Sequence, residues 1–326
     1  MTDVPYVSAA ELERLLDYPS LVDALAAGFA ADWTVPVRHH YSIPMPHGEP
    51  EQMLLLMPAW EAGQAIGMKL ATITPGNGPR GLPAVNAVYL LVDGPTGQPR
   101  ALIEGATLTV RRTAAASALA ARYLVRRDAA RMLMVGAGAL ARPLVEAHCS
   151  QRSIKRVQLW ARDAKKRDAK VKELAALGLP VEPAENLERS AREADLISCA
   201  TLSTEPLIRG AWLKPGTHLD LVGAFTPEMR ESDDAAVGMA SLFCDTRAGA
   251  LKEGGDLVIP LKAGRITEAA VKADLADLAR GKHKGRMTED EVTLFKSVGT
   301  AIEDFAAARL AMQRLQAVPS AAGGKN

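Results

Sequence analysis

From residue 131 onwards, short apolar runs alternate with segments of helical periodicity. The runs that predict strands are Met132–Val135, Arg156–Trp160, Leu196–Ala200, His218–Val222 and Ser241–Cys244, with a weaker one at Leu179–Val181. Segments between them, such as 164–177 and 187–194, repeat apolar residues at helical spacing. Alternation at this spacing predicts an α/β fold with a doubly wound parallel sheet.

The N-terminal third has a different pattern. Ser8 and Glu11 form a capping-box signature, which predicts a short helix to about Leu16 and is followed by a second helical pattern over 20–33. Short β-like runs separated by Gly, Pro and Asn turns then predict an antiparallel or mixed sheet with hairpins. These runs are Met53–Met57, Ala65–Thr72, Val85–Val92 and Arg100–Glu104, and an alanine-rich helix is expected over 107–124.

The strand Met132–Val135 runs into a glycine turn, Gly136-Ala137-Gly138-Ala139-Leu140-Ala141, and a helical pattern follows from Leu140 to Cys149. This order of strand, Gly-x-Gly-x-x-Ala turn and helix is the context that a dinucleotide-binding fingerprint requires. The first glycine permits the tight turn, and the second lets a pyrophosphate approach the backbone at the helix N-terminus. The turn predicts contacts between a dinucleotide and residues 136–140.

We therefore expect a Rossmann domain over 114–296. A long final helix over 289–315 is expected to return to the N-terminal segment, which makes residues 1–113 and 297–326 one discontinuous mixed α+β domain. The small-residue tail Pro319–Asn326 is expected to be disordered.

Composition narrows the function. The formal net charge is +1, aromatic residues make up 4% of the chain, and neither sign of charge forms a block, so binding of nucleic acid or membrane is not expected. Cys149, Cys199 and Cys244 lie far apart, without metal-ligand or disulfide spacing. The first residues lack a signal-peptide pattern, and no apolar run is long enough to span a bilayer. A soluble cytoplasmic protein without a metal is expected.

The end of the second predicted Rossmann strand bears on the choice of cofactor. NAD enzymes place an acidic residue there to accept the ribose hydroxyls. Here Arg162 takes that approximate place, and Lys165, Lys166 and Arg167 follow. These cations suit a 2′-phosphate and favour NADPH, while Asp163 beside Arg162 keeps NADH possible.

Five spaced motifs around this nucleotide fold resemble those of the ornithine cyclodeaminase/μ-crystallin family. They are Gly67-Met68-Lys69-Leu70, Asp93…Thr96-Gly97, Leu108-Thr109-Val110-Arg111-Arg112-Thr113, Val222-Gly223-Ala224-Phe225-Thr226-Pro227 and Thr293…Ser297-Val298-Gly299. The resemblance covers about residues 8–315. It implies a homodimer whose mixed domain carries the substrate pocket and the dimer contacts. Family activities include cyclodeamination of ornithine or lysine, amino-acid dehydrogenation, cyclic imine reduction and ligand binding.

The resemblance also implies roles for single residues. Lys69 is the pocket lysine that bonds the substrate and relays a proton, and strand alternation puts it on one face with the small residues Gly67 and Ala71. Arg38 pairs with the substrate carboxylate. Arg112 contacts that carboxylate or a cofactor phosphate, with Thr113 beside it, whereas Arg111 is expected to be solvated or ion-paired.

Further contacts are expected from segments that follow the later strands. The nicotinamide is expected near Thr201, Val222 and Gly223, and Ser297 and Val298 are expected to close the pocket, with Ser297 contacting the cofactor and Val298 the substrate.

The chain departs from the cyclodeaminases at Phe225, where their chemistry depends on an aspartate. A phenyl ring can neither take a proton nor stabilise a cationic amine. Glu228 and Glu231 could substitute, but they are expected to be carboxylates at a helix N-terminus.

The Gly-Ala-Phe-Thr-Pro form resembles family members that reduce cyclic imino acids. We therefore expect NAD(P)H-dependent reduction of Δ1-pyrroline-2-carboxylate to L-proline, and of Δ1-piperideine-2-carboxylate to L-pipecolate. The alternatives are an ornithine or lysine cyclodeaminase, an alanine-type dehydrogenase, and a non-enzymatic NADPH-dependent binding protein of the μ-crystallin kind.

Overall fold

The computed structural model describes residues 4–317, and the expected disordered tail lies outside them. The described chain forms two compact units. The first contains the residues up to Arg112 together with those from Ala301 onwards, and the second contains 113–300. Among residues 4–317, no helix is both long and apolar enough to cross a bilayer.

The first unit is built on a six-stranded mixed sheet with the strand order β1-β6-β5-β4-β3-β2. Its hairpins are antiparallel, and β1 pairs in parallel with β6. The strands are β1 (Tyr6–Val7), β2 (His39–Ile43), β3 (Gln52–Glu61), β4 (Ala65–Ile73), β5 (Val85–Asp93) and β6 (Pro99–Glu104), with short 3₁₀ turns at Pro46–Gly48 and Pro75–Arg80. The expected mixed sheet is confirmed.

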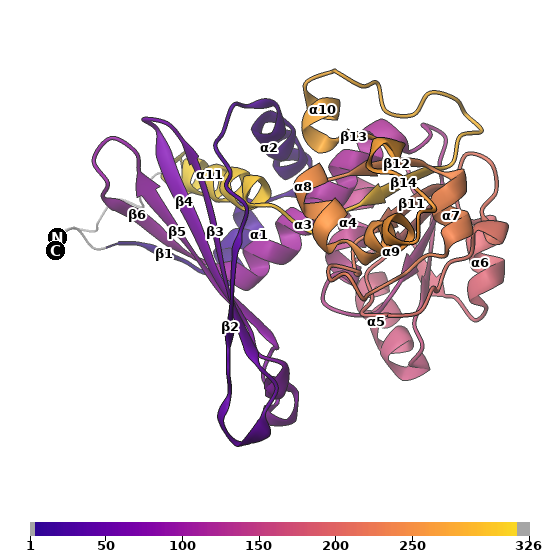
Figure 1. Ribbon diagram of the computed structural model, residues 1–326, viewed down its shortest axis with the longest axis horizontal. Coiled ribbons are helices and arrows are strands. Elements are labelled where there is room, and N and C mark those ends of the chain that lie inside the picture. The colour runs from indigo at the N-terminus through magenta and orange to yellow at the C-terminus, as the bar shows by residue number, and fades with distance from the viewer. Residues whose placement is uncertain (1–3, 318–326) are drawn as a thin grey trace. The chain divides into compact units, whose positions relative to one another are not determined.

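One face of this sheet is covered by helices. Helix α11 (Ala301–Ala317) packs against β3 and β4, and α1 (Ala9–Leu15) and α2 (Tyr18–Ala30) pack against α11 (Figure 1). The capping box that begins α1 is present, since the side chains of Ser8 and Glu11 each bond the other's backbone. The alternating residues Leu55, Met57 and Ala59 of β3 are buried on the sheet. Helix α3 (Gly105–Leu124) carries the chain to the second unit.

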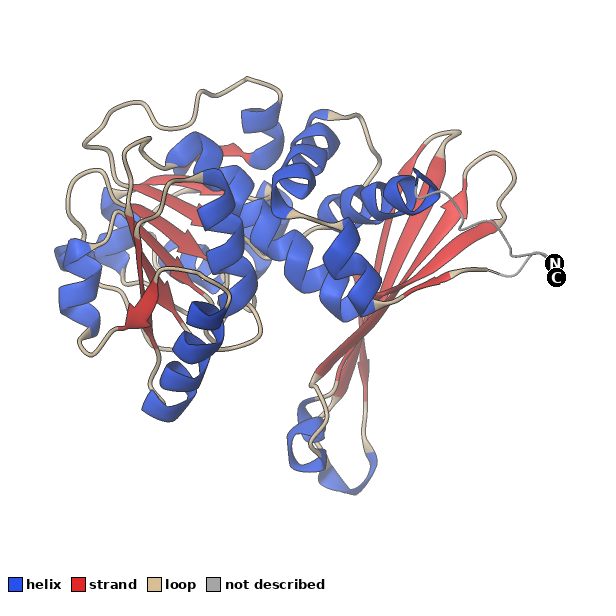
Figure 2. Ribbon diagram, turned by 180° about the vertical axis from the view of Figure 1, so that it is seen from behind, coloured by secondary structure: helices blue, strands red, loops and turns tan. Residues whose placement is uncertain are grey.

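The second unit contains an eight-stranded parallel sheet in the order β13-β12-β14-β11-β10-β7-β8-β9, with helices on both faces (Figure 2). Its strands are β7 (Arg131–Val135), β8 (Arg156–Trp160), β9 (Val181–Pro183), β10 (Leu196–Cys199), β11 (His218–Leu221), β12 (Ser241–Cys244), β13 (Val271–Asp274) and β14 (Thr293–Lys296). Its helices are α4 (Ala141–Gln151), α5 (Ala164–Ala176), α6 (Leu187–Glu193), α7 (Asp234–Met239), α8 (Arg247–Glu253), α9 (Gly255–Lys262) and α10 (Leu275–Ala279), with 3₁₀ turns at Gly210–Trp212 and Glu268–Ala270. This is the expected doubly wound sheet.

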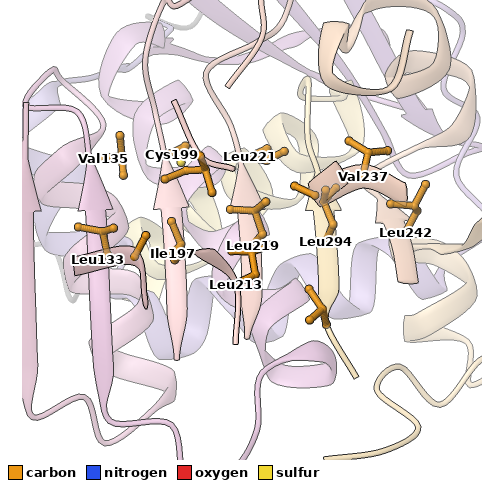
Figure 3. Close-up of a cluster of buried hydrophobic side chains, with 14 of the residues drawn as sticks. Leu133, Val135, Ile197, Cys199, Leu213, Leu219, Leu221, Val237, Leu242 and Leu294 are labelled. Carbon is orange, nitrogen blue, oxygen red and sulfur yellow. The ribbon is translucent and has the colours of Figure 1, made fainter. Parts of the chain in front are cut away.

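Alternate residues of the parallel strands build the core. On one face Leu133 and Val135 of β7, Ile197 and Cys199 of β10, and Leu219 of β11 are fully buried and lie side by side (Figure 3). Because the strands are covered on both faces, they read as apolar runs, which made them recognisable in the sequence.

The expected final helix over 289–315 is wrong in its first part. Residues 293–296 form β14, which pairs with β11 on one side and β12 on the other. Gly299 then adopts φ of +82°, a backbone conformation that ends regular structure, and α11 begins at Ala301. Residues 297–300 lie with the second unit, where Asp245 accepts the N–H groups of Val298 and Gly299, each at 2.7 Å.

Candidate active site

The glycine turn after β7 leaves an open cradle at the start of α4. Gly136 has φ of +116°, and a Cβ placed on it would lie 2.6 Å from the carbonyl oxygen of Ala200, so a side chain does not fit there. A Cβ on Gly138, in contrast, would meet no atom within 4 Å. The N-cap residue of α4, Leu140, supplies no side-chain hydrogen bond to the helix N-terminus. Exposed N–H groups beside open space suit a pyrophosphate.

Other residues expected to bind the cofactor come together at the carboxyl ends of neighbouring strands. Thr201 follows β10, Val222 and Gly223 follow β11, and Ser297 follows β14. Backbone bonds continue the ladder here, since Val222 N–H donates to Cys199 and Ser297 N–H donates to Leu221. Strand order reverses between β7 and β10, and ligands of open α/β sheets bind beyond the carboxyl ends at such a point.

Ser297 provides a second indication of a ligand at this edge. Its side chain is 2% exposed, and its hydroxyl has no hydrogen-bond partner among the described residues. Buried hydroxyls usually have a partner, so an unsatisfied one beside the strand ends fits a polar ligand. The residues of this edge therefore fit a bound dinucleotide.

The segment after β8 contains the residues expected to determine the preference between NADPH and NADH. Asp163 is the N-cap of α5, and its Oδ1 accepts the N–H groups of Lys165 and Lys166 at 3.0 and 3.2 Å. Arg162 is exposed. The expectation that Arg167 belongs to a phosphate site is wrong, because Arg167 is buried and ion-paired with Asp168 and Glu185.

In the first unit, Lys69 and Arg112 meet at one carboxylate. Lys69 Nζ lies 2.7 Å from Asp304 Oδ2, and Arg112 Nε donates to Asp304 Oδ1 at 3.0 Å. Arg112 Nη1 also donates to Glu303. All four side chains are buried. We call Lys69, Arg112, Glu303 and Asp304 the buried charge cluster.

Burial and neighbouring charges shift the ionisation of this cluster. Burial lowers the pKa of Lys69 to about 8, although Asp304 raises it. Burial opposes ionisation of Arg112, but Asp304 and Glu303 raise its pKa above the ordinary value. Burial acts to raise the pKa of Asp304, but the charges of Arg112 and Lys69 outweigh burial and hold this pKa below its ordinary value. The carboxyl of Asp304 therefore stays ionised. Of these three groups, Lys69 has the pKa nearest to neutral pH.

Tyr89 forms the wall of the cluster on the neighbouring strand. It is paired with Lys69 in the β4–β5 register and is fully buried. A Cβ on Gly67 would lie 1.9 Å from the Tyr89 hydroxyl oxygen, so glycine at position 67 makes room for the phenol. The hydroxyl has no hydrogen-bond partner among the described residues, and burial, followed by Asp304, raises its pKa well above the ordinary value.

The remaining expected contacts are distributed as follows. Arg38 is half-buried and directly precedes β2. In the sheet, the next residue, His39, pairs with Leu56 of β3, and the residue after Leu56, Met57, pairs with Lys69 of β4. Arg38 therefore enters the sheet at about the level of Lys69, two strands away. Thr113 and Val298 are half-buried in the second unit.

Arg111 differs from the expectation of a solvated or ion-paired residue. It is buried, its guanidinium donates to the carbonyl of Leu16, with Nε at 2.9 Å, and its Cζ lies 4.5 Å from the centre of the Tyr18 ring. Arg111 therefore joins α3 to the loop between α1 and α2.

Glu303 and Asp304 were not expected from the sequence, although two adjacent arginines in an alanine-rich helix must each be exposed or paired. The acids lie in the first turn of α11, which was hidden inside a helix expected to begin much earlier. The expectation for Glu231 is also wrong: it is fully buried, and its carboxylate bonds the turns after β10 and β11 instead of a helix N-terminus.

Comparison with known proteins gives matches over the whole fold. A Δ1-pyrroline-2-carboxylate reductase of Paracoccus denitrificans is 38% identical over 255 residues, covering 78% of this chain and 81% of the relative. The solved structure of Thermococcus litoralis Δ1-pyrroline-2-carboxylate reductase with NADH and L-proline is 33% identical, with a TM-score of 0.89 and coverage of 96% and 98%. An archaeal alanine dehydrogenase dimer with NAD is 26% identical, with a TM-score of 0.87 and coverage of 96% of both chains.

The model of the ornithine cyclodeaminase/mu-crystallin family matches residues 3–318, nearly the full length, and agrees with the resemblance found in the motifs. The chain belongs to the ornithine cyclodeaminase/mu-crystallin family.

Proposed function

We propose that this protein is an NAD(P)H-dependent reductase of cyclic imino acids. It converts Δ1-pyrroline-2-carboxylate to L-proline, and Δ1-piperideine-2-carboxylate to L-pipecolate. In each case the carbon of the C=N bond gains a hydride and the nitrogen gains a proton, while NAD(P)H becomes NAD(P)⁺. The observation that carries the proposal is the similarity over nearly the full chain to a reductase whose structure was solved in complex with NADH and L-proline.

The buried charge cluster supplies the groups that a carboxylate substrate needs. A guanidinium has five N–H donors and an ammonium has three, so Arg112 and Lys69 each have capacity for a ligand carboxylate in addition to Asp304. Arg38, at the same level of the sheet, is a third cation for that carboxylate. Charge-assisted bonds from a guanidinium also fix the orientation of the acid. Val298 is proposed as an apolar contact of the substrate.

The second unit holds the dinucleotide in this proposal. The turn 136–140 receives the pyrophosphate, and Thr201, Val222, Gly223 and Ser297 contact the nicotinamide half. Thr113, next to Arg112 in α3, makes a further cofactor contact. Bound NAD(P)H supplies the hydride, and that chemistry belongs to the cofactor.

Lys69 is the proposed catalytic residue. With its pKa at about 8, the ammonium is protonated at neutral pH and can transfer its proton to the substrate nitrogen. Phe225, in the turn after β11, has no carboxyl to support deamination. Its side chain is 38% exposed, so this turn presents an apolar surface.

We further propose a preference for NADPH over NADH. Asp163 is occupied as the N-cap of α5, and this role competes with binding of ribose hydroxyls. The exposed Arg162, together with the exposed Lys165 and Lys166, can then pair with a 2′-phosphate.

A homodimer formed through the six-stranded sheet completes the proposal. The face of the sheet opposite α11 is apolar, and on it Ile66 and Leu70 of β4 are 41% and 40% exposed and Leu102 of β6 is 39% exposed. An exposed apolar face of this kind marks an interaction surface. A family relative of high structural similarity is a dimer. The occupant proposed for this face is therefore a second copy of the chain.

Replacing Lys69 tests the substrate site. Lys69→Ala should lower kcat/KM for Δ1-pyrroline-2-carboxylate at least tenfold while the Kd for the reduced cofactor stays within twofold, measured by fluorescence titration. In the wild type, kcat/KM should fall as pH rises through about 8, because Lys69 then loses its proton. Lys69→Arg should move that fall to higher pH, which separates it from titration of the imine. Equal losses of turnover and cofactor affinity in Lys69→Ala would contradict the role.

Replacing Arg162 tests the cofactor preference. Arg162→Asp should reduce the ratio of kcat/KM for NADPH to that for NADH by at least tenfold, because a carboxylate repels the 2′-phosphate. Lys155→Asp, an exposed charge change between α4 and β8, serves as the control and should leave the ratio unaltered. An unchanged ratio in Arg162→Asp would remove this residue from phosphate recognition.

Replacing Leu70 tests the dimer. Leu70→Glu places a charge on the apolar face and should convert the protein to a monomer in light scattering coupled to gel filtration. Leu177→Glu alters a leucine that is 50% exposed in the second unit and should remain dimeric. If the wild type is monomeric, or if Leu70→Glu stays dimeric, the proposed interface is wrong.

A further inference from the structure

We infer that Glu231 is a positioning residue for the nicotinamide, because its carboxylate holds together the turns that follow β10 and β11. The inference rests on the proposed binding of NAD(P)H at this edge of the sheet. Glu231 itself is fully buried beneath the turns. It acts through Thr201 and Gly223, the residues expected to contact the ring.

The carboxylate uses both oxygens in this bridge. Oε1 accepts the backbone N–H of Thr201 at 2.7 Å and the Thr201 hydroxyl at 2.8 Å. Oε2 accepts the backbone N–H of Gly223 at 2.8 Å. One side chain therefore fixes two backbone N–H groups, those of Thr201 and Gly223, that the strand ladders leave unpaired. Hydrogen bonds of this kind are short and strong when the accepting carboxyl is ionised.

The two turns approach each other so closely that only glycine fits at position 223. A Cβ there would lie 2.1 Å from the Thr201 carbonyl oxygen and 2.2 Å from its nitrogen. Such contacts require the backbone itself to move. The distance between the turns is thus set by direct contact on one side and by the Glu231 bridge on the other.

A second layer of buried charge holds Glu231 in place. Asp256 Oδ1 accepts the N–H groups of Glu231 and Ser232, each at 2.9 Å. Lys296 Nζ lies 3.4 Å from Asp256 Oδ2 and donates to the carbonyl of Leu221 at 3.0 Å. Lys296 is the last residue of β14 and directly precedes Ser297. The network therefore also connects the end of β14 to the turns after β10 and β11.

Burying the carboxylate of Glu231 costs folding free energy, and this cost supports a functional reason for its position. Burial, and then the negative charge of Asp256, raise the pKa of Glu231 to about 7, although Lys296 lowers it. A buried carboxylate with a raised pKa opposes folding unless its bonds compensate, and such groups concentrate at functional sites. Reacting atoms are placed precisely only when the groups that touch a ligand are themselves held by further side chains.

The test compares a whole cofactor with a fragment that lacks nicotinamide. Glu231→Gln keeps the shape but replaces one accepting oxygen with an NH₂ group facing a backbone N–H. We expect the Kd for NADH to rise at least fivefold and kcat with Δ1-pyrroline-2-carboxylate to fall at least tenfold. The Kd for ADP-ribose should stay within twofold, because the glycine turn is untouched. The control is Glu228→Gln, which changes an exposed residue between β11 and Glu231 and should change none of these values.

Glu231→Asp keeps the charge, but the aspartate side chain is too short to span both turns. It should therefore weaken NADH binding and lower kcat without changing the Kd for ADP-ribose. This variant provides the test if Glu231→Gln fails to fold. Unchanged NADH binding and kcat, or equal weakening of NADH and ADP-ribose, would overturn the inference. A wild-type protein that binds neither NADH nor NADPH would instead refute the proposed function.

Discussion

The first unit depends on the pairing of one carboxylate, that of Asp304, with two buried cations. Lys69 comes from the sheet and Arg112 from α3, and neither could be buried without a compensating acid. Asp304 lies on α11, the last helix of the chain. Helix α11 must therefore return to the N-terminal sheet, which explains why a unit built from the start of the chain is completed by its end.

The same carboxylate sets the chemistry available to the cations. It holds Lys69 and Arg112 in one place while leaving donors for a ligand acid, and together with burial it adjusts the pKa of Lys69 to about 8. In the second unit Glu231 has a corresponding place, since a buried acid fixes the turns that are expected to receive the nicotinamide. In both units, a buried acid lies behind the residues proposed to bind a ligand and determines where those residues lie.

The fold class could be predicted from the sequence because its evidence is local. Strands buried on both faces read as apolar runs, and the turn after β7 carries its own glycine signature. The strand β14 was missed because its four residues precede a long helix without an obvious turn, and only Gly299 marks the break. Asp304 and Glu231 could not be recognised, since an acid near a helix start or turn is usually solvated. Their roles arise from contacts between segments far apart in the chain.

The most direct measurement of the central claim is oxidation of NADPH and NADH by the purified protein with Δ1-pyrroline-2-carboxylate, run beside NAD⁺ with L-ornithine and an ammonia assay. We expect rapid reduction of the imine to L-proline and no ammonia from ornithine, because Phe225 offers no carboxyl for deamination. Release of ammonia and proline from ornithine would contradict the claim and would mean that another acid replaces the missing aspartate.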